Sequence, residues 1–162
     1  SKSPKEIHPN EKKKIIQQLN LNAIQYCFFS EIQYGNWRCL SVKEELNPVE
    51  KYNIILVTAI ADATPLAEQL KKNGHSITHL EYRDHHHFTK NDVKKILNNY
   101  KENDSAKKLI LTTEKDAVKL KLFEKDFENV NIYFAPINIR IRDKEEFDNQ
   151  IEKYVRTNKR NC

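Results

Sequence analysis

The chain has 162 residues, of which 38% are hydrophobic and 31% charged, and it carries a formal net charge of +5. This length fits one main domain with an additional segment, and the composition, with two glycines and three cysteines, excludes collagen-like, disordered and disulfide-scaffold classes. The positive charge permits phosphorylated ligands, nucleic acid or an acidic membrane surface as partners, whereas no apolar run is long enough to span a membrane, so we expect a soluble chain.

The N-terminal part of the chain predicts a helix followed by a β ribbon. Apolar residues at helical spacing predict the helix over residues 10–19. Two β-prone runs, Gln25–Phe29 and Trp37–Val42, flank Gly35-Asn36, and this turn signal predicts a hairpin or two-stranded ribbon. Asn47-Pro48 then marks a boundary, after which the pattern changes.

Beyond that boundary, strands and helices alternate. Strands are expected over residues 53–59, 77–82, 108–112, 130–134 and 137–141. Helices are expected over residues 65–73, with Thr64 as the N-cap, and over 91–100, 116–122 and 144–156. The continuous apolar run at 53–59 is typical of a strand that is buried on both faces of a parallel sheet. The alternation therefore predicts the α/β class, as a three-layer sandwich with a mostly parallel sheet.

Three loops that follow predicted strands hold the residues most suited to chemistry, at 61–65, 83–88 and 113–116. Because ligands gather beyond the carboxyl ends of parallel strands, we expect these loops at one edge of the sheet. Asp84 beside His85 is the most informative pair, since a carboxylate can orient an imidazole, which can accept a hydroxyl proton at near-neutral pH. The alternative is that Asp84 caps a turn while the imidazoles face solvent.

Two further positions admit either a ligand-binding or a structural interpretation. Thr113 and Asp116 fit an N-cap with its capping-box partner, but Lys115 opposes the helix dipole there and therefore predicts pairing with an acid or an anionic ligand. Asp62 either meets a ligand or metal at the strand end or stabilises the turn before Thr64. No GxxxxGK[ST] or GxGxxG motif is present, so a nucleotide would need a phosphate cradle from outside the chain.

Several segments, taken in order, resemble the C-terminal half of tetraacyldisaccharide 4'-kinases. They are residues 29–35, 55–61, 65–66, 84–89 and 111–118, and the resemblance runs over nearly the whole chain. The most specific parts are the DHHHFT segment that begins at Asp84 and the TTEKDAV segment that begins at Thr112. The resemblance implies the fold of the C-terminal half of a two-domain P-loop-type kinase, with a helix and a two-stranded ribbon before the α/β domain.

The resemblance also implies an activity. Such enzymes transfer the γ-phosphate of ATP to the 4'-hydroxyl of a tetraacyldisaccharide 1-phosphate, with Mg²⁺, in the lipid A biosynthesis that leads to lipopolysaccharide. ATP, Mg²⁺ and the membrane surface would be bound mainly by an N-terminal half that this chain lacks, on the cytoplasmic side of the bacterial inner membrane. We therefore expect no metal site within the chain, no nucleic acid partner and, without the phosphate loop, no kinase activity of the chain alone.

Carried onto this sequence, the resemblance places the family's Asp-His pair at Asp84 and His85, with His85 as the catalytic group that helps to activate the acceptor. His86, Lys115 and Asp62 are the candidates for positions near the substrate or the nucleotide. The implied domains are residues 1–24 as a remnant of the kinase domain, with a strand end and a helix, 25–46 as the ribbon, 47–158 as the C-terminal α/β domain and 159–162 as a tail.

Two other functional classes remain open from the sequence. A metal-dependent phosphoesterase would bring Asp62, Asp84 and His85 together around Mn²⁺ or Zn²⁺, and metal titration would detect it. A non-catalytic anion-binding module would present its basic surface to nucleic acid or anionic lipid. The kinase hypothesis requires His85 to lie on the rim of the sheet, at the same edge as the helix start that carries Lys115.

Overall fold

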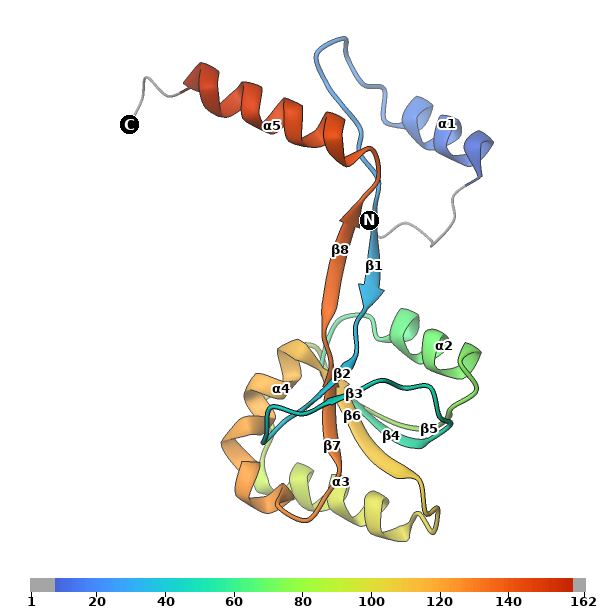
Figure 1. Cartoon of the computed structure of the whole chain (residues 1–162), viewed down its shortest axis with the longest axis vertical. Helices are drawn as coiled ribbons and strands as arrows, with labels where there is room; N and C mark the ends of the chain where they lie inside the picture. The colour runs from blue at the N-terminus through green and yellow to red at the C-terminus, as the bar shows by residue number, and fades with distance from the viewer. Residues whose placement is uncertain (1–7, 159–162) are drawn as a thin grey trace. The chain divides into compact units, whose positions relative to one another are not determined.

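The structure is a computed structural model that describes residues 8–158 and divides them into two compact units (Figure 1). One unit is Tyr34–Pro136. The other consists of the described residues up to Gln33 together with those from Ile137 onward. The strand end predicted at residues 1–4 and the tail predicted at residues 159–162 lie outside the described residues.

A six-stranded sheet forms the centre of the Tyr34–Pro136 unit, in the strand order β3-β2-β7-β6-β4-β5. Its strands are β2 (Trp37–Cys39), β3 (Glu45–Leu46), β4 (Asn53–Thr58), β5 (Ser76–Glu81), β6 (Lys108–Thr113) and β7 (Ile132–Ala135). β4 runs parallel to β5 and β6, and β6 runs parallel to β7, whereas β2 runs antiparallel to both β3 and β7. The prediction of an α/β fold with a mostly parallel sheet is therefore confirmed.

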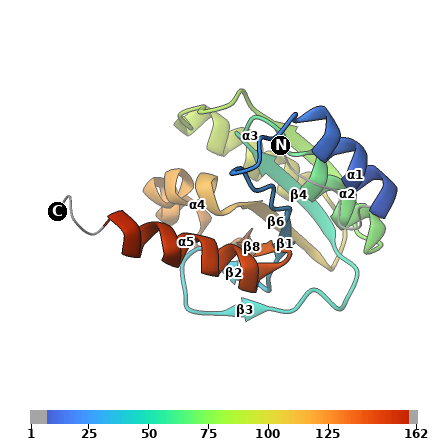
Figure 2. The ribbon, with the colours of Figure 1, turned by 90° about the horizontal axis from the view of Figure 1, so that it is seen from above.

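Helices cover both faces of this sheet and make it a three-layer sandwich. They are α2 (Thr64–Lys72), α3 (Lys90–Glu102), α4 (Glu114–Leu120) and the 3-10 helix η1 (Lys121–Phe127). Ile54 of β4 packs in one hydrophobic cluster with Leu66 of α2, whereas its neighbour Ile55 packs in the opposite cluster with Ile96 of α3. This alternation follows from the strand period of two residues, and burial of each such side chain contributes roughly 2 kcal/mol. Figure 2 shows α2 and α4 on either side of β4 and β6.

The helices and strands of this unit begin and end close to where the sequence predicts them. Most predicted ends move by one or two residues. The expected N-cap of α2 is wrong, because Thr64 is the first helical residue and Ala63, in the N-cap position, provides no capping side chain. The carboxylate of Asp62 accepts a hydrogen bond from the N–H of Thr64 at 3.0 Å instead. Asp62 thus has the turn-stabilising role that the sequence left open.

The unit formed by the two ends of the chain contains α1 (Pro9–Gln18), β1 (Ser30–Tyr34), whose last residue belongs to the other unit, β8 (Ile137–Ile141) and α5 (Lys144–Asn158). β1 pairs with β8, and the two strands run in opposite directions (Figure 1). The predicted two-stranded ribbon is therefore present, but its pairing as a hairpin between Gln25–Phe29 and Trp37–Val42 is wrong. Gly35-Asn36 connects β1 to β2 without folding them onto each other, because β2 pairs with β7 and the N–H of Gly35 donates to the carbonyl of Pro136 at 3.0 Å.

Within this second unit, aromatic and charged contacts tie the helices to the rest. The rings of Phe28 and Phe147 meet edge to face with centroids 5.2 Å apart, and Lys12 of α1 pairs with Asp143 at 3.0 Å. Neither α1 nor α5 contains a buried residue among those described. No helix in the part of the chain that the structure describes combines the length and the apolar character that a membrane crossing needs.

Candidate functional site

The loops after β4, β5 and β6 meet at one edge of the sheet, as the parallel strand order requires. Ala59, directly after β4, is buried and links them. Its N–H donates to the carboxylate of Asp116 at 2.8 Å, and its carbonyl accepts a hydrogen bond from the N–H of His85 at 3.2 Å. The predicted convergence of these loops is therefore confirmed.

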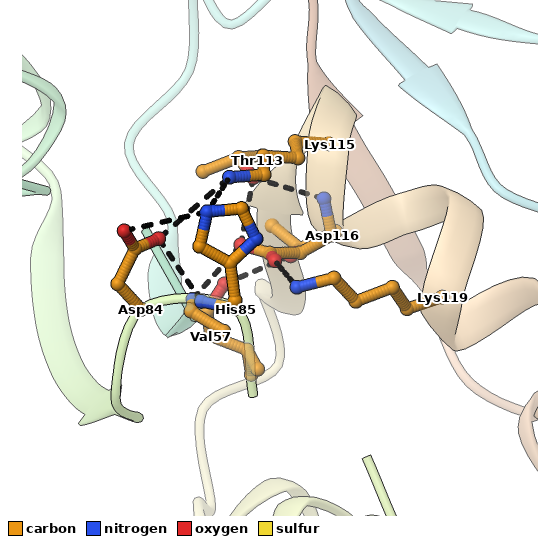
Figure 3. Close-up of polar contacts among 9 residues, drawn as sticks. Val57, Asp84, His85, Thr113, Lys115, Asp116 and Lys119 are labelled. Carbon is orange, nitrogen blue, oxygen red and sulfur yellow. Dashed lines mark hydrogen bonds and ion pairs between the residues drawn. The ribbon is translucent and has the colours of Figure 1, made fainter. Parts of the chain in front are cut away.

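His85, Asp84 and Lys115 form a polar cluster on this edge (Figure 3). Lys115 Nζ lies 3.5 Å from His85 Nε2 and 3.6 Å from Asp84 Oδ1. The other carboxylate oxygen, Asp84 Oδ2, lies 3.7 Å from His85 Nε2. The side chains of His85, Asp84 and Lys115 are 74%, 38% and 49% exposed, so a ligand can reach all three from solvent. His85 lies on the rim beside Lys115, and Lys115 pairs with an acid, as predicted.

The cluster combines a base with a cation and a carboxylate. The ammonium of Lys115 can only donate, so its 3.5 Å contact with His85 fits the tautomer that has an unprotonated Nε2 and carries the ring proton on Nδ1. In that tautomer, Nε2 is a proton acceptor. An ion pair as exposed as Lys115 and Asp84 contributes only about 0–1 kcal/mol, so stability does not explain the arrangement.

His85 has a left-handed backbone conformation, with a φ of 61°. It is the third residue of a turn that closes through a hydrogen bond from the N–H of His86 to the carbonyl of Arg83 at 3.0 Å. A histidine in this conformation costs about 1 kcal/mol, and strained residues of this kind cluster at functional sites. Asp84 also stabilises the turn, because its Oδ1 accepts from the N–H of His85 at 3.0 Å. The turn-stabilising interpretation of Asp84 is therefore confirmed, whereas its chemical role stays a prediction.

Asp116 is the buried anchor of this edge, a role that sequence reasoning missed. Its side chain is 0% exposed and accepts hydrogen bonds from the N–H of Ala59 and the hydroxyl of Thr113, both at 2.8 Å. Lys119 donates to its other oxygen at 3.0 Å (Figure 3). The predicted capping box is thus half correct: Thr113 caps the N–H of Asp116, but the carboxylate reaches across to the end of β4. A signal was present, since Asp116 lies one turn before the buried Leu120, on the apolar face of α4.

His86 and Asp62, the other two candidates, have structural partners of their own. His86 Nε2 lies 3.0 Å from Asp92 Oδ2, and its ring stacks on that of Tyr82. Asp62 bonds to the start of α2. Burial and, secondarily, the charge of Asp62 raise the pKa of Tyr34.

The described residues do not fit a metal site. No group of three or more His, Cys, Asp or Glu side chains within residues 8–158 is arranged to hold a metal ion. The phosphoesterase alternative, which needs Asp62, Asp84 and His85 around one metal, therefore finds no support. Within the same residues, no group of three such side chains is available to hold Mg²⁺.

A family model described as tetraacyldisaccharide-1-P 4'-kinase matches residues 4–156. Curated relatives named tetraacyldisaccharide 4'-kinase include one from Bacteroides thetaiotaomicron, which is 35% identical over 99% of this chain and 46% of its own length. Another, from Flavobacterium johnsoniae, is 30% identical over 98% of this chain and 44% of its own length. The chain thus spans about half the length of the curated relatives it matches, 46% in the first case.

A solved structure shares the fold. The crystal structure of LpxK from Aquifex aeolicus in complex with ATP matches 86% of this chain and 40% of its own, with a TM-score of 0.51 and 14% identity. The likeness supports the arrangement of strands and helices described above.

Proposed function

Because the chain belongs to the tetraacyldisaccharide-1-P 4'-kinase family, we propose that it supplies the acceptor-activating edge of an enzyme that phosphorylates the 4'-hydroxyl of a tetraacyldisaccharide 1-phosphate with ATP. The observation that carries the proposal is the imidazole of His85, exposed on the rim of the sheet beside Asp84 and Lys115. A phosphoryl transfer of this kind needs a group that accepts the hydroxyl proton and cations that neutralise the phosphoryl oxygens. In the cluster, His85 can accept the proton and Lys115 supplies a cation.

In the proposed reaction, the 4'-oxygen attacks the γ-phosphorus of ATP, and the bond from that phosphorus to the β,γ-bridging oxygen breaks. ADP leaves with the electron pair of that bond. The hydroxyl proton passes to Nε2 of His85, and Asp84 then faces the resulting imidazolium and stabilises it. Because positioning dominates such transfers, the location of His85 at the sheet edge matters more than its basicity.

Lys115 has to leave His85 before the acceptor binds, because its ammonium occupies the position at Nε2 that the hydroxyl needs. A phosphoryl oxygen attracts an ammonium more strongly than a neutral imidazole does. We therefore infer that Lys115 turns from His85 to the transferred phosphoryl group when substrates bind. Its half-exposed side chain has room for that rotation.

The proposal assigns the remaining requirements of the reaction to other parts of a full-length kinase. This chain has no GxxxxGK[ST] loop, so we assign the cradle for the ATP phosphates to those other parts. We assign to them also the Mg²⁺ ligands and the contact with the cytoplasmic side of the inner membrane. The assignment of Asp62 and His86 as residues near the substrate or the nucleotide stays a prediction, as do the domain boundaries taken from the resemblance.

A chimeric kinase tests the proposal. The segment of the Bacteroides thetaiotaomicron relative that matches this chain is replaced by this chain, and transfer of labelled γ-phosphate to the lipid is measured. We expect activity from the unaltered chimera and none from this chain alone. His85→Ala should lower kcat by about 10²–10⁴, the contribution of a general base. His87→Gln is the matched control, because His87 is exposed in the same loop. Full activity of the His85→Ala chimera would refute the proposal.

A further inference from the structure

His86 is fixed on three sides, unlike its neighbour His85. Its ring stacks on Tyr82 with centroids 4.9 Å apart and an angle of 24° between the planes. Phe88 meets the same ring edge on, at 5.5 Å. Nε2 of His86 lies 3.0 Å from Asp92 Oδ2, and the side chain is 29% exposed, against 74% for His85. The second imidazole of the loop is therefore packed into the domain, while the first faces solvent.

Asp92, the partner of His86, belongs to the rigid part of the domain. Its Oδ2 accepts hydrogen bonds from both the N–H and the hydroxyl of Thr89 at 2.8 Å, within the capping box that starts α3. α3 in turn packs into the core through Val93 and Ile96. Burial by itself raises the pKa of Asp92, but the hydrogen bonds from His86 and Thr89 outweigh it, and the pKa lies below its ordinary value. Asp92 is thus an ionised acceptor fixed to a core helix.

The loop that His86 anchors holds a strained residue. The left-handed φ of 61° at His85 favours glycine, and such a conformation persists only where the surroundings enforce it. His86 directly follows His85, and its own N–H closes the turn by bonding to the carbonyl of Arg83. If the turn relaxed, the imidazole of His85 would leave its place beside Lys115.

We propose that His86 is a positioning residue, which holds His85 in its left-handed conformation through the bond to Asp92. This inference rests on the proposed function, since the conformation matters to the reaction only if His85 accepts the hydroxyl proton. His86 itself does not contact the substrate in this assignment. Instead, by holding the turn in place, His86 keeps His85 from leaving its left-handed conformation.

Amide exchange in this chain tests the inference without any activity. His86→Phe keeps an aromatic ring against Tyr82 but removes the bond to Asp92, and His87→Phe makes the same change at an exposed position. We expect His86→Phe to speed exchange of the residue 85 amide by about tenfold or more, as the loss of a hydrogen bond to a carboxylate predicts. Exchange of the Val57 amide in β4 and the effect of His87→Phe serve as references.

A double variant separates positioning from general stabilisation. Glycine adopts a positive φ without strain, so in a His85→Gly background residue 85 should keep this conformation with or without the bond from His86 to Asp92. There His86→Phe should change exchange of the residue 85 amide by less than about threefold. A general loosening of the loop would instead speed exchange equally in both backgrounds. Equal effects in the two backgrounds would overturn the inference.

The chimeric kinase keeps the two proposals distinguishable. We expect His86→Phe to lower kcat while the KM for ATP stays within about twofold, because misplacing a proton acceptor affects the chemical step. An unaltered chimera without activity would contradict the proposed function and leave the exchange result standing. An active His86→Phe chimera with wild-type kcat would refute the positioning role.

Discussion

Removal of the Asp116 carboxylate should destabilise the Tyr34–Pro136 unit. In Asp116→Ala the N–H of Ala59 and the hydroxyl of Thr113 lose their common acceptor in a fully buried site. Each such group costs about 1–3 kcal/mol when left unsatisfied. Lys119, whose side chain is 21% exposed, can turn to water and adds little. We expect a loss of roughly 3 kcal/mol in the free energy of unfolding.

Asp116→Asn separates the hydrogen bonds from the charge. The amide oxygen can occupy the place of Oδ2 and keep both acceptor contacts, while the amide nitrogen loses only the contact with Lys119. The expected loss is therefore about 1 kcal/mol, close to that of a partly exposed ion pair. Asp126→Ala, an exposed acid in η1, should change stability by less than about 0.5 kcal/mol.

Urea denaturation, followed by tryptophan fluorescence, measures these differences. Trp37 is the single tryptophan of the chain, it is 2% exposed, and it lies in the same unit as Asp116. A loss below about 1 kcal/mol for Asp116→Ala, or equal losses for the Ala and Asn variants, would show that Asp116 does not anchor this edge.

Two further predictions concern the opposite edge of the sheet. His75 is buried and its Nδ1 accepts from the N–H of Tyr52 at 3.2 Å, and burial lowers the pKa of His75 from 6.5. Because the unfolded chain binds this proton more readily, the free energy of unfolding should fall as the pH drops below about 6.5. His75→Gln should weaken this pH dependence, as measured by urea titrations. The dependence that remains should come from His79, whose pKa burial also lowers. Gly74→Ala should cost about 1–2 kcal/mol in thermal denaturation, because Gly74 has a φ of 87°. The stem of Lys51, 3.1 Å from the added Cβ, can move aside and adds little.

The central sheet could be predicted because the sequence patterns that specify its strands lie within short segments of the chain. The apolar runs of β4 and β6 identify strands buried on both faces, and the helices between strands impose the parallel order. That order alone brings the loops with His85 and Lys115 to one edge. The candidate site was therefore accessible from the sequence before any distance was known.

The remaining features depend on partners that are far apart in the chain. β1 and β8 are separated by the whole Tyr34–Pro136 unit, so the nearby Gly35-Asn36 turn signal gave the wrong partner. Asp116 fits a local cap equally well, and only the position of Ala59 reveals the bond across to β4. The positive φ of His85 could not be read from the sequence, because non-glycine residues, histidine included, adopt a positive φ only uncommonly.

The two units differ in whether they are built from one continuous segment of the chain. Tyr34–Pro136 is one uninterrupted segment, whereas the other unit takes described residues from both sides of it. During synthesis the sheet domain can therefore fold as soon as its last strand leaves the ribosome, while β1 must wait for β8 to emerge. Until then the early strand presents an unpaired edge, the kind of surface on which newly made chains aggregate.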